Sequence, residues 1–522
     1  MHRWTTQAAA GGAQKLIWSV EGVNELPGLD PANPQNAQSV QAINLIFGGL
    51  VKLDDKLNVV GDGAESWTVS EDGKTYTFKI RPGLKFADGT AVTAQDFADS
   101  INRALQPETA SYGASFQLGH IVGAADVAAG SAKEASGIKV VDDGTLEITL
   151  DDNLPYFLAQ LTYPVSFVVP KAAIAANPTG WTETAYGTGP FKVKEWQHNQ
   201  KLILEPNPNY WAGAPGVSEV ELPFFQDSET AYQLYRTGGL DIMGSQQNPI
   251  PSARIPKVKD SPDFHSAASF AVRYVGFNNK LAPFDNPDVR RAFALAVDKA
   301  TLANAVLNGA VAPTDRILPP GFTGSQLPIK GLAFDAAAAK ESLAKAGYNE
   351  SNPFPQVTFT YGVEGDNERV ATFLQQQWKE NLGVDVVLQP LELATFSKNL
   401  DTTYLTPDQG LQFYLSIWGA DYPDPQNFVS QQLRSDSPNN NGHWENAQFD
   451  ELAKKADTFL GSADERLQLY NQAEQIAVDE VGWLPLYVPQ FSVLIRPEVS
   501  GYSLTGQGLI FPDWTKVTSR GQ

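Results

Sequence analysis

The residue types that most often carry out catalysis or bind metals are few and scattered in this sequence. Five histidines occur, at positions 2, 120, 198, 265 and 443, and none of them has the spacing of metal ligands in patterns such as HExxH or HxH. The G-x-S-x-G turn of many serine hydrolases is absent. The chain also has no cysteine, which excludes disulfides, thiolate ligands and cysteine nucleophiles. We therefore expect no metal site, no cofactor and no enzymatic activity.

Two other patterns look like catalytic motifs but do not meet the requirements of those motifs. The run Gly73-Lys74-Thr75 is similar to the end of a phosphate-binding loop, yet the glycine required five residues earlier is Thr68. Acidic pairs such as Asp421 and Asp424 are expected in an acidic chain, where most carboxylates are solvated. A secreted hydrolase is kept as the alternative from another functional class.

The charge balance restricts the partners that the chain can bind. With 59 acidic and 38 basic residues the net charge is −21, and there is no basic stripe, so we expect no nucleic-acid partner. No run of 18 or more apolar residues occurs, so no membrane-spanning segment is predicted. Residues 1–14 lack the apolar stretch of a signal peptide and are predicted to form a flexible leader.

The elements that would position a binding site alternate between strands and helices. Lys15 to Val20 is predicted to be a strand. Two hairpins turn at Asp-Gly pairs, one within Trp67 to Ile80 and one within Ile138 to Leu150. Thr93 to Leu105 is predicted to be an amphipathic helix whose first residue and the acidic residue three positions later form a capping pair.

The second half of the chain has the alternation typical of an α/β protein. Asn286 to Leu307 is predicted to be one long helix with a proline in its first turn. Residues 334–346 and 370–382 are predicted to be further helices, and strand-like runs follow them at 356–361 and 384–388. Helices alternating with strands indicate an α/β fold, and 522 residues suggest more than one domain.

One stretch is far more specific than these general features. Residues 64–105 contain A-x-x-W, then S-x-D-G at a hairpin turn, then the run TFKIRPGLKFADGTAVTAQDF. This order resembles the signature of the family-5 (peptide/nickel-type) extracellular solute-binding proteins of ABC importers. Shorter matches at 188–211, 282–290 and 484–487 extend the resemblance over nearly the whole chain, and segments between 109 and 171 resemble the oligopeptide-binding branch.

The resemblance implies a particular domain organisation. The expected fold is α/β, a two-lobe periplasmic-binding-protein fold (class II, cluster C type) with an extra inserted domain and a hinge between the lobes. Lobe I would consist of residues 15–46, 170–272 and 489–522. The inserted domain would span 47–169, and lobe II would span 273–488.

The same resemblance implies where a ligand would bind. Residues 417–428 read IWGADYPDPQNF and resemble the W-x-A-D segment of oligopeptide binders. In that segment the aspartate, here Asp421, accepts the α-ammonium group of the ligand. Trp418 and the backbone of Gly419 and Ala420 would line the peptide. A buried carboxylate is costly unless it is paired, and a ligand ammonium would be a suitable partner.

Two further positions are implied less directly. The loop at 34–37 is equivalent to one whose backbone pairs with an extended peptide as an added strand, which places Asn36 and Ala37 at the ligand. Phe116 lies near an aromatic residue that covers the ligand in the oligopeptide branch. The chain departs from that branch before Trp418, where residues 406–413 contain no Arg or His to meet a ligand carboxylate. Recognition of a peptide carboxyl terminus is therefore not predicted.

The predicted function is capture of an oligopeptide between the two lobes and its delivery to an ABC permease in the membrane. We expect an extracytoplasmic monomer whose precursor carries a lipid anchor. Within the same transport role, an oligosaccharide or another small polar solute is the alternative, because tryptophans such as Trp418 and Trp444 could stack on sugars. A folding helper that grips extended chains is a third possibility.

Overall fold

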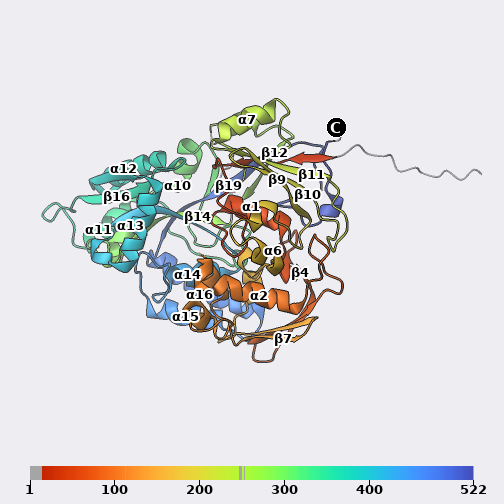
Figure 1. The fold of residues 1–522 in the computed structure, drawn as a ribbon. Coiled ribbons are helices and arrows are strands. Elements are labelled where there is room, and N and C mark those ends of the chain that lie inside the picture. The colour runs from red at the N-terminus through yellow and green to blue at the C-terminus, as the bar shows by residue number, and fades with distance from the viewer. Residues whose placement is uncertain (1–13, 112, 246–249, 252, 521–522) are drawn as a thin grey trace, which may run out of the picture.

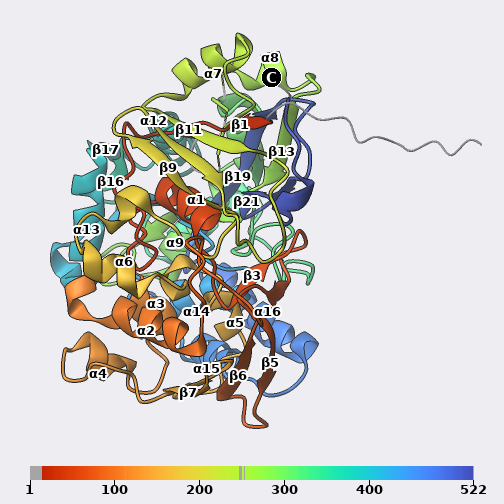
Figure 2. The same ribbon diagram turned by 45° about the vertical axis from the view of Figure 1, so that its right-hand side comes forward.

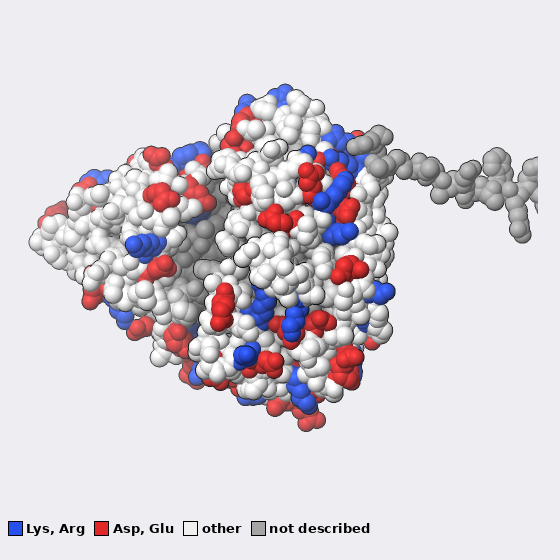
Figure 3. All heavy atoms as spheres, in the orientation of Figure 1, with Lys and Arg blue, Asp and Glu red and all other residues white. Residues whose placement is uncertain are grey.

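The computed structural model describes residues 14–111, 113–245, 250–251 and 253–520, so the predicted leader lies outside it except for Gln14. The chain has a mixed α/β architecture. Helices α11 (Ala336–Lys345), α12 (Asn367–Leu382) and α13 (Leu393–Leu405) and strand β16 (Val357–Gly362) form one body, seen at the left of Figure 1. Strands β9 (Phe191–Gln197), β10 (Lys201–Pro206) and β11 (Glu219–Phe225) and helix α1 (Ala37–Ile46) belong to a second body beside it. The surface between these bodies is hollowed (Figure 3).

The first lobe, as we call the body with β9 to β11, is built on a five-stranded sheet. Its order is β1-β11-β10-β9, with β2 also paired to β11. The strands are β1 (Lys15–Ile17), β2 (Val20–Glu21), β9 (Phe191–Gln197), β10 (Lys201–Pro206) and β11 (Glu219–Phe225). The helices are α1 (Ala37–Ile46), α6 (Lys171–Ala176), α7 (Ser228–Arg236) and α8 (Ile255–Val258). The predicted strand at 15–20 is thus divided into β1 and β2 around Trp18 and Ser19.

A smaller body, which we call the inserted body, follows α1 in the chain and lies below it in Figure 2. Its four-stranded sheet has the order β5-β6-β8-β7, and β3 pairs with β4. The strands are β3 (Val51–Leu53), β4 (Val59–Gly61), β5 (Ala64–Val69), β6 (Thr75–Ile80), β7 (Ile138–Asp142) and β8 (Thr145–Thr149). The helices are α2 (Ala94–Leu105), α3 (Ala114–Leu118), α4 (Ala124–Ala128) and α5 (Phe157–Gln160).

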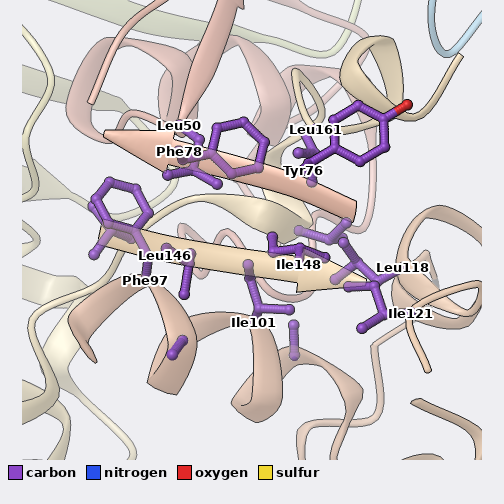
Figure 4. Close-up of a cluster of buried hydrophobic side chains, with 14 of the residues drawn as sticks. Leu50, Tyr76, Phe78, Phe97, Ile101, Leu118, Ile121, Leu146, Ile148 and Leu161 are labelled. Atoms are coloured by element: carbon purple, nitrogen blue, oxygen red, sulfur yellow. The ribbon is translucent and has the colours of Figure 1, made fainter. Parts of the chain in front are cut away.

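The inserted body is stabilised by one apolar core between its sheet and α2. Phe78 and Leu146 face Phe97 and Ile101 of the helix (Figure 4), and all four side chains are fully buried. Burial of a side chain of this size contributes roughly 1.5–3 kcal/mol. The predicted capping of α2 is confirmed, because the Asp96 carboxylate accepts hydrogen bonds of 2.8 Å from the backbone N–H and from the hydroxyl of Thr93. Both predicted Asp-Gly hairpins are present as β5-β6 and β7-β8.

The second lobe is built on most of an eight-stranded sheet. The sheet order is β12-β19-β14-β18-β16-β17, and β13 and β15 also pair with β19. The strands are β12 (Ile242–Met243), β13 (Phe264–Ala268), β14 (Ala271–Phe277), β15 (Val311–Pro313), β16 (Val357–Gly362), β17 (Val386–Leu391), β18 (Phe413–Gly419) and β19 (Leu484–Ile495). The predicted strands at 356–361 and 384–388 are confirmed as β16 and β17, which pair in parallel.

Helices cover the second lobe in two groups with separate apolar cores. Those on the β16 side are α9 (Pro287–Leu295), α10 (Lys299–Thr301), α11 (Ala336–Lys345), α12 (Asn367–Leu382) and α13 (Leu393–Leu405). Of these, α13 directs Phe396 into the core of the second group. Those on the other side are α14 (Val429–Leu433), α15 (Ala447–Asp457) and α16 (Ala463–Asp479). Within the described ranges, no helix is both long and apolar enough to cross a membrane.

The single helix predicted for residues 286–307 was wrong. The chain forms α9, leaves the helix after Leu295, and begins again at α10, which continues as a π-helical turn over Leu302–Val306. Asp298 accounts for the break, because its carboxylate accepts a hydrogen bond from the Thr301 N–H and so caps a new helix. The apolar periodicity of the sequence continues across this point, so the pattern did not indicate that Asp298 caps a new helix.

Two stretches of chain pass between the lobes. The first is the short link between β13 and β14, where the Ser269 N–H donates to the Pro489 carbonyl at 2.9 Å. The second is β19, whose first half pairs with β14 and β15 and whose second half pairs with β13 and β12. The C-terminal hairpin β20 (Ser503–Thr505) and β21 (Gly508–Ile510) lies against the first of these links, since the Phe270 N–H donates to the Gly506 carbonyl at 2.7 Å.

Candidate functional site

Strand β18 ends at the crossing between the lobes with one edge open. Along its whole length β18 pairs with β14, and Gly419 lies opposite Ala271, just after the first crossing link. On its other side β18 pairs with β16 only from Phe413 to Leu415, so Ser416 to Gly419 have no second strand among the described residues. The open edge is long enough for an extended segment of another molecule to pair with it.

The backbone groups at this open edge can be identified from the alternation of an antiparallel pair. The Ala420 N–H donates to the Phe270 carbonyl at 2.8 Å, so even-numbered residues of this strand direct their backbone groups toward β14. The N–H and carbonyl groups of Ile417 and Gly419 therefore point to the open side. Ile417 is 39% exposed, although it lies within the strand. This backbone edge is the feature on which an extended ligand would align.

Asp421 follows this edge and forms no ion pair with the described residues. Its backbone N–H donates to Asn427 Oδ1 at 3.1 Å, and Asn427 Nδ2 makes a long contact of 3.5 Å with its carboxylate. Burial raises the pKa of Asp421 to about 6, against the smaller lowering effect of hydrogen bonds from Asn427 and Gln431. No Lys, Arg or His of the described chain lies within 4 Å of the carboxylate. A positively charged group from outside the chain would satisfy it.

Trp418 and Asp421 are held by the same amide. Trp418 Nε1 donates to Asn427 Oδ1 at 3.2 Å, and Asn427 Nδ2 donates to Gln431 Oε1 at 2.8 Å. Asn427 is fully buried at the end of the 3-10 turn Pro425–Asn427, just before α14, so its position is fixed by packing. Asn427 and Gln431 thus orient two of the predicted site residues, a role that the sequence did not indicate.

The loop after Asp421 is anchored by a buried ion pair and an aromatic stack. The Arg466 guanidinium donates two hydrogen bonds of 2.8 Å to the Asp424 carboxylate, a bidentate pair. Tyr422 is fully buried and stacks on Tyr156 of the inserted body, with ring centroids 6.2 Å apart. The loop is therefore fixed to α16 and to the inserted body at the same time.

Gln507 connects this segment to the first lobe. Its Nε2 donates to the Ala420 carbonyl at 3.1 Å across the crossing. Gln507 also lines a cavity of about 340 Å³ between the first lobe and the inserted body, and Ala37 lines the same cavity. Gln507 thus binds the 418–421 segment and shares a cavity with Ala37. No local pattern could have indicated Gln507, because it is 87 residues from Ala420 in the chain.

Asn36 is the N-cap residue of α1. Its side chain caps α1 by accepting from the Ser39 N–H at 2.8 Å, and its carbonyl accepts from the Val40 N–H at 3.1 Å. Helix formation therefore uses both the side-chain oxygen and the carbonyl oxygen of Asn36. An extended peptide could pair only with the backbone N–H groups of this loop.

The remaining aromatic predictions lie in apolar cores. Phe116, in α3, is half-buried against the core of the inserted body, a core that also contains Tyr422. Trp444, one of the tryptophans considered for sugar stacking, is only 2% exposed and packs on Phe449. Trp418 is half-buried and keeps part of its surface accessible.

Comparison with known proteins places this geometry in a family. The model of the "Bacterial extracellular solute-binding proteins, family 5 Middle" matches residues 58–440. The chain is 34% identical over 490 residues to the "Probable deoxycholate-binding periplasmic protein YgiS" of Escherichia coli, covering 91% of this chain and 88% of that protein. It is 33% identical over 497 residues to the "Periplasmic oligopeptide-binding protein OppA" of Salmonella typhimurium, covering 92% and 88%.

A solved structure supports the same architecture. The murein tripeptide binding protein MppA of Escherichia coli superposes with a TM-score of 0.77 at 28% sequence identity, covering 96% of this chain and 98% of that one. The predicted two-lobe fold is confirmed by this likeness together with the family match.

Proposed function

This chain belongs to the bacterial extracellular solute-binding proteins of family 5, and we propose that it captures a short peptide with a free α-amino group between its lobes. The observation that carries the proposal is Asp421, a carboxylate that burial leaves with a raised pKa and without a cationic partner within 4 Å among the described residues. An isolated buried charge is unfavourable, and a ligand ammonium supplies its missing partner. At an effective dielectric near 20, a contact at about 4 Å contributes on the order of 4 kcal/mol before desolvation.

The open edge of β18 supports an extended ligand rather than a compact one. A peptide whose amino group lies at Asp421 would run along Gly419 and Ile417 and pair with their outward backbone groups as an added strand. Backbone pairing does not depend on side-chain identity, so the site would accept peptides of varied sequence. Trp418, Gly419 and Ala420 would line the ligand, with Asn36, Ala37 and Phe116 as the further contacts to be tested.

The transport role, the domain limits and the location are part of the same proposal. Family membership supports delivery of the ligand to an ABC permease by a monomeric extracytoplasmic protein. We assign residues 15–46, 170–272 and 489–522 to lobe I, 47–169 to the inserted domain and 273–488 to lobe II, because the separate apolar cores follow these limits closely. A lipid anchor on the precursor is the remaining prediction.

A bile acid is the second candidate ligand, because a relative at 34% identity is named for deoxycholate. Deoxycholate is an anion and carries no ammonium group. Its carboxylate would be repelled by an ionised Asp421, and it has no backbone to pair with β18. The geometry therefore favours a peptide over a bile acid.

The class of ligand can be tested by thermal unfolding and calorimetric titration. We expect tri- to pentapeptides, and not deoxycholate or cello-oligosaccharides, to stabilise the protein, by about 2.7 kcal/mol at a hundred times the dissociation constant. Asp421→Asn should lose most of the peptide affinity, whereas Asp143→Asn, an exposed hairpin-turn substitution of the same kind, should retain it. Stabilisation by deoxycholate or sugars alone would overturn the peptide proposal.

A further inference from the structure

Arg273 is a partly buried cation for which the described residues provide no anion. It lies in β14, and its Nε is buried and makes no hydrogen bond. Its guanidinium takes part in none of the ion pairs within 4 Å that the described residues form. The contact that its side chain makes is a hydrogen bond with Tyr487, which is a neutral phenol because burial raises its pKa.

Other buried arginines of the same lobe are satisfied within the protein. Arg316 binds the fully buried carboxylate of Glu474 at 2.7 Å, and Arg466 binds Asp424 through both terminal nitrogens. Arg290 forms no ion pair, but its guanidinium donates to three backbone carbonyls. Arg273 differs from these in having a buried Nε without a hydrogen bond and no carboxylate partner among the described residues. Removing a charged group from water is costly unless it is paired, so such a guanidinium indicates an anionic group that arrives with the ligand.

The register of the sheet places Arg273 beside the open edge of β18. Arg273 pairs with Ile417 on one side and with Tyr487 on the other. Because side chains alternate along a strand, Arg273 shares a face with Ile417 and Gly419, the residues whose backbone groups point to the open side.

An acidic side chain that acts on Tyr487 is already engaged. Asp366 precedes α12 and acts electrostatically on Tyr487, but its carboxylate pairs with Arg369 at 2.7 Å. Among the described residues, no carboxylate lies within 4 Å of the Arg273 guanidinium.

We propose that Arg273 binds the carboxylate group of the ligand, opposite the α-ammonium group held at Asp421. This inference rests on the proposed function and adds the second charged end of the peptide. Four residue steps separate Ile417 from Asp421, roughly 13 Å at about 3.3 Å per residue, which is the length of an extended peptide of about four residues. The absence of Arg and His from residues 406–413 is then compensated from the neighbouring strand.

The experiment compares peptides that differ only in one charge. Calorimetric titrations use tetra-alanine with a free carboxyl terminus, the same peptide as its C-terminal amide, and an amide in which the last residue is glutamate. We expect the wild-type protein to bind the free acid about tenfold or more tightly than the amide, as for a hydrogen bond to a charged group. If the glutamate amide regains the affinity, an acidic side chain can serve as the carboxylate source; if it does not, the terminal carboxylate is the source.

Variants test whether Arg273 causes the difference in affinity between the free acid and the amide. Arg273→Met should bind acid and amide equally, with the affinity for the amide unchanged, and Arg273→Lys should keep part of the preference. Arg254→Met removes an arginine that pairs with Glu229 in the first lobe and should behave as wild type. Equal binding of acid and amide by the wild-type protein would overturn the role of Arg273 and leave peptide capture intact. If none of the peptides binds, the proposed function itself fails, and with it this inference.

Discussion

Asp421 is a largely buried carboxylate whose hydrogen-bond partners among the described residues are amides. Asn427 and Gln431 are its hydrogen-bond partners, and neither carries a charge that could neutralise it. Such a group is stabilised far less in the empty protein than it would be by a bound ammonium. Its raised pKa leads to two expectations, one for the ligand and one for the protein alone.

Peptide affinity should fall as the pH drops below about 6. Protonation of Asp421 removes the charge that faces the ligand ammonium, so well below that pKa the affinity should fall about tenfold per pH unit. Calorimetric titration of one peptide between pH 4.5 and 8 measures this slope. In Asp421→Asn the fall in affinity at low pH should disappear. A fall that persists in the variant would contradict the assignment of this pH dependence to Asp421.

The empty protein should be more stable without the charge of Asp421. Between pH about 4 and about 6 the folded chain retains a proton that the unfolded chain has lost, so this group lowers stability as the pH rises through that window. Asp421→Asn should therefore raise the free energy of unfolding at pH 7 by about 1–2 kcal/mol, since partial exposure reduces the full effect of the shift. Urea unfolding without peptide tests this, and a destabilised variant would show that the carboxylate supports the fold.

At this scale the sequence indicated some residues of the candidate site and could not indicate others. The W-x-A-D run carries its own signal, so Trp418 and Asp421 could be recognised from their order alone. Asn427 and Gln507 could not, because one amide among many has no local pattern and Gln507 reaches Ala420 only after the chain has folded. Arg273 was missed for a similar reason, since its neighbour Ile417 lies on a different strand.

The elements around the site are fixed by contacts between distant parts of the chain. The loop between β18 and α14 is attached to α16 by the Asp424–Arg466 pair and to the inserted body by the stack of Tyr422 on Tyr156. A backbone edge that is to pair with a ligand must be held in place before the ligand arrives, because ordering it at that moment would reduce affinity. The buried ion pair supplies this rigidity.

Arg466→Met should destabilise the protein by about 3 kcal/mol or more, because Asp424 is then buried without its partner. Asp424→Asn should destabilise the protein by a similar amount. The double variant should lose less unfolding free energy than the sum of the losses in the two single variants. Urea unfolding of the four proteins gives the coupling energy. The exposed pair Lys139–Glu147 is the control, since Lys139→Met should change stability by less than about 1 kcal/mol. Additive losses at Asp424 and Arg466 would exclude a coupled anchor.

Local signals predicted elements well where one residue type determines the structure. Asp-Gly turns and the Thr93–Asp96 capping box specify hairpins and a helix start within a few residues. The helix predicted across residues 286–307 failed because apolar periodicity continues through the break, whereas the capping of a new helix by Asp298 depends on one side chain. The open edge of β18 was not predictable, because strand order is a property of the whole sheet.

At the scale of the whole molecule, the candidate site lies where the lobes are joined. Asp421 and the edge of β18 belong to the second lobe, while the cavity with Ala37 lies between the first lobe and the inserted body, and Gln507 contacts both. In the described part of the chain, the β13–β14 link and β19 join the lobes. Two narrow links permit a hinge motion, and a ligand held from both sides would favour the closed arrangement.

The most direct test of the central claim is the effect of capping the ligand amine. Thermal unfolding of the wild-type protein would be followed with one tetrapeptide and with its N-acetylated form at the same concentrations. Acetylation removes the positive charge and leaves the backbone and side chains intact. If Asp421 binds the α-ammonium group, the free peptide should raise the unfolding temperature and the acetylated peptide should raise it little or not at all. Equal stabilisation by both forms would contradict the claim.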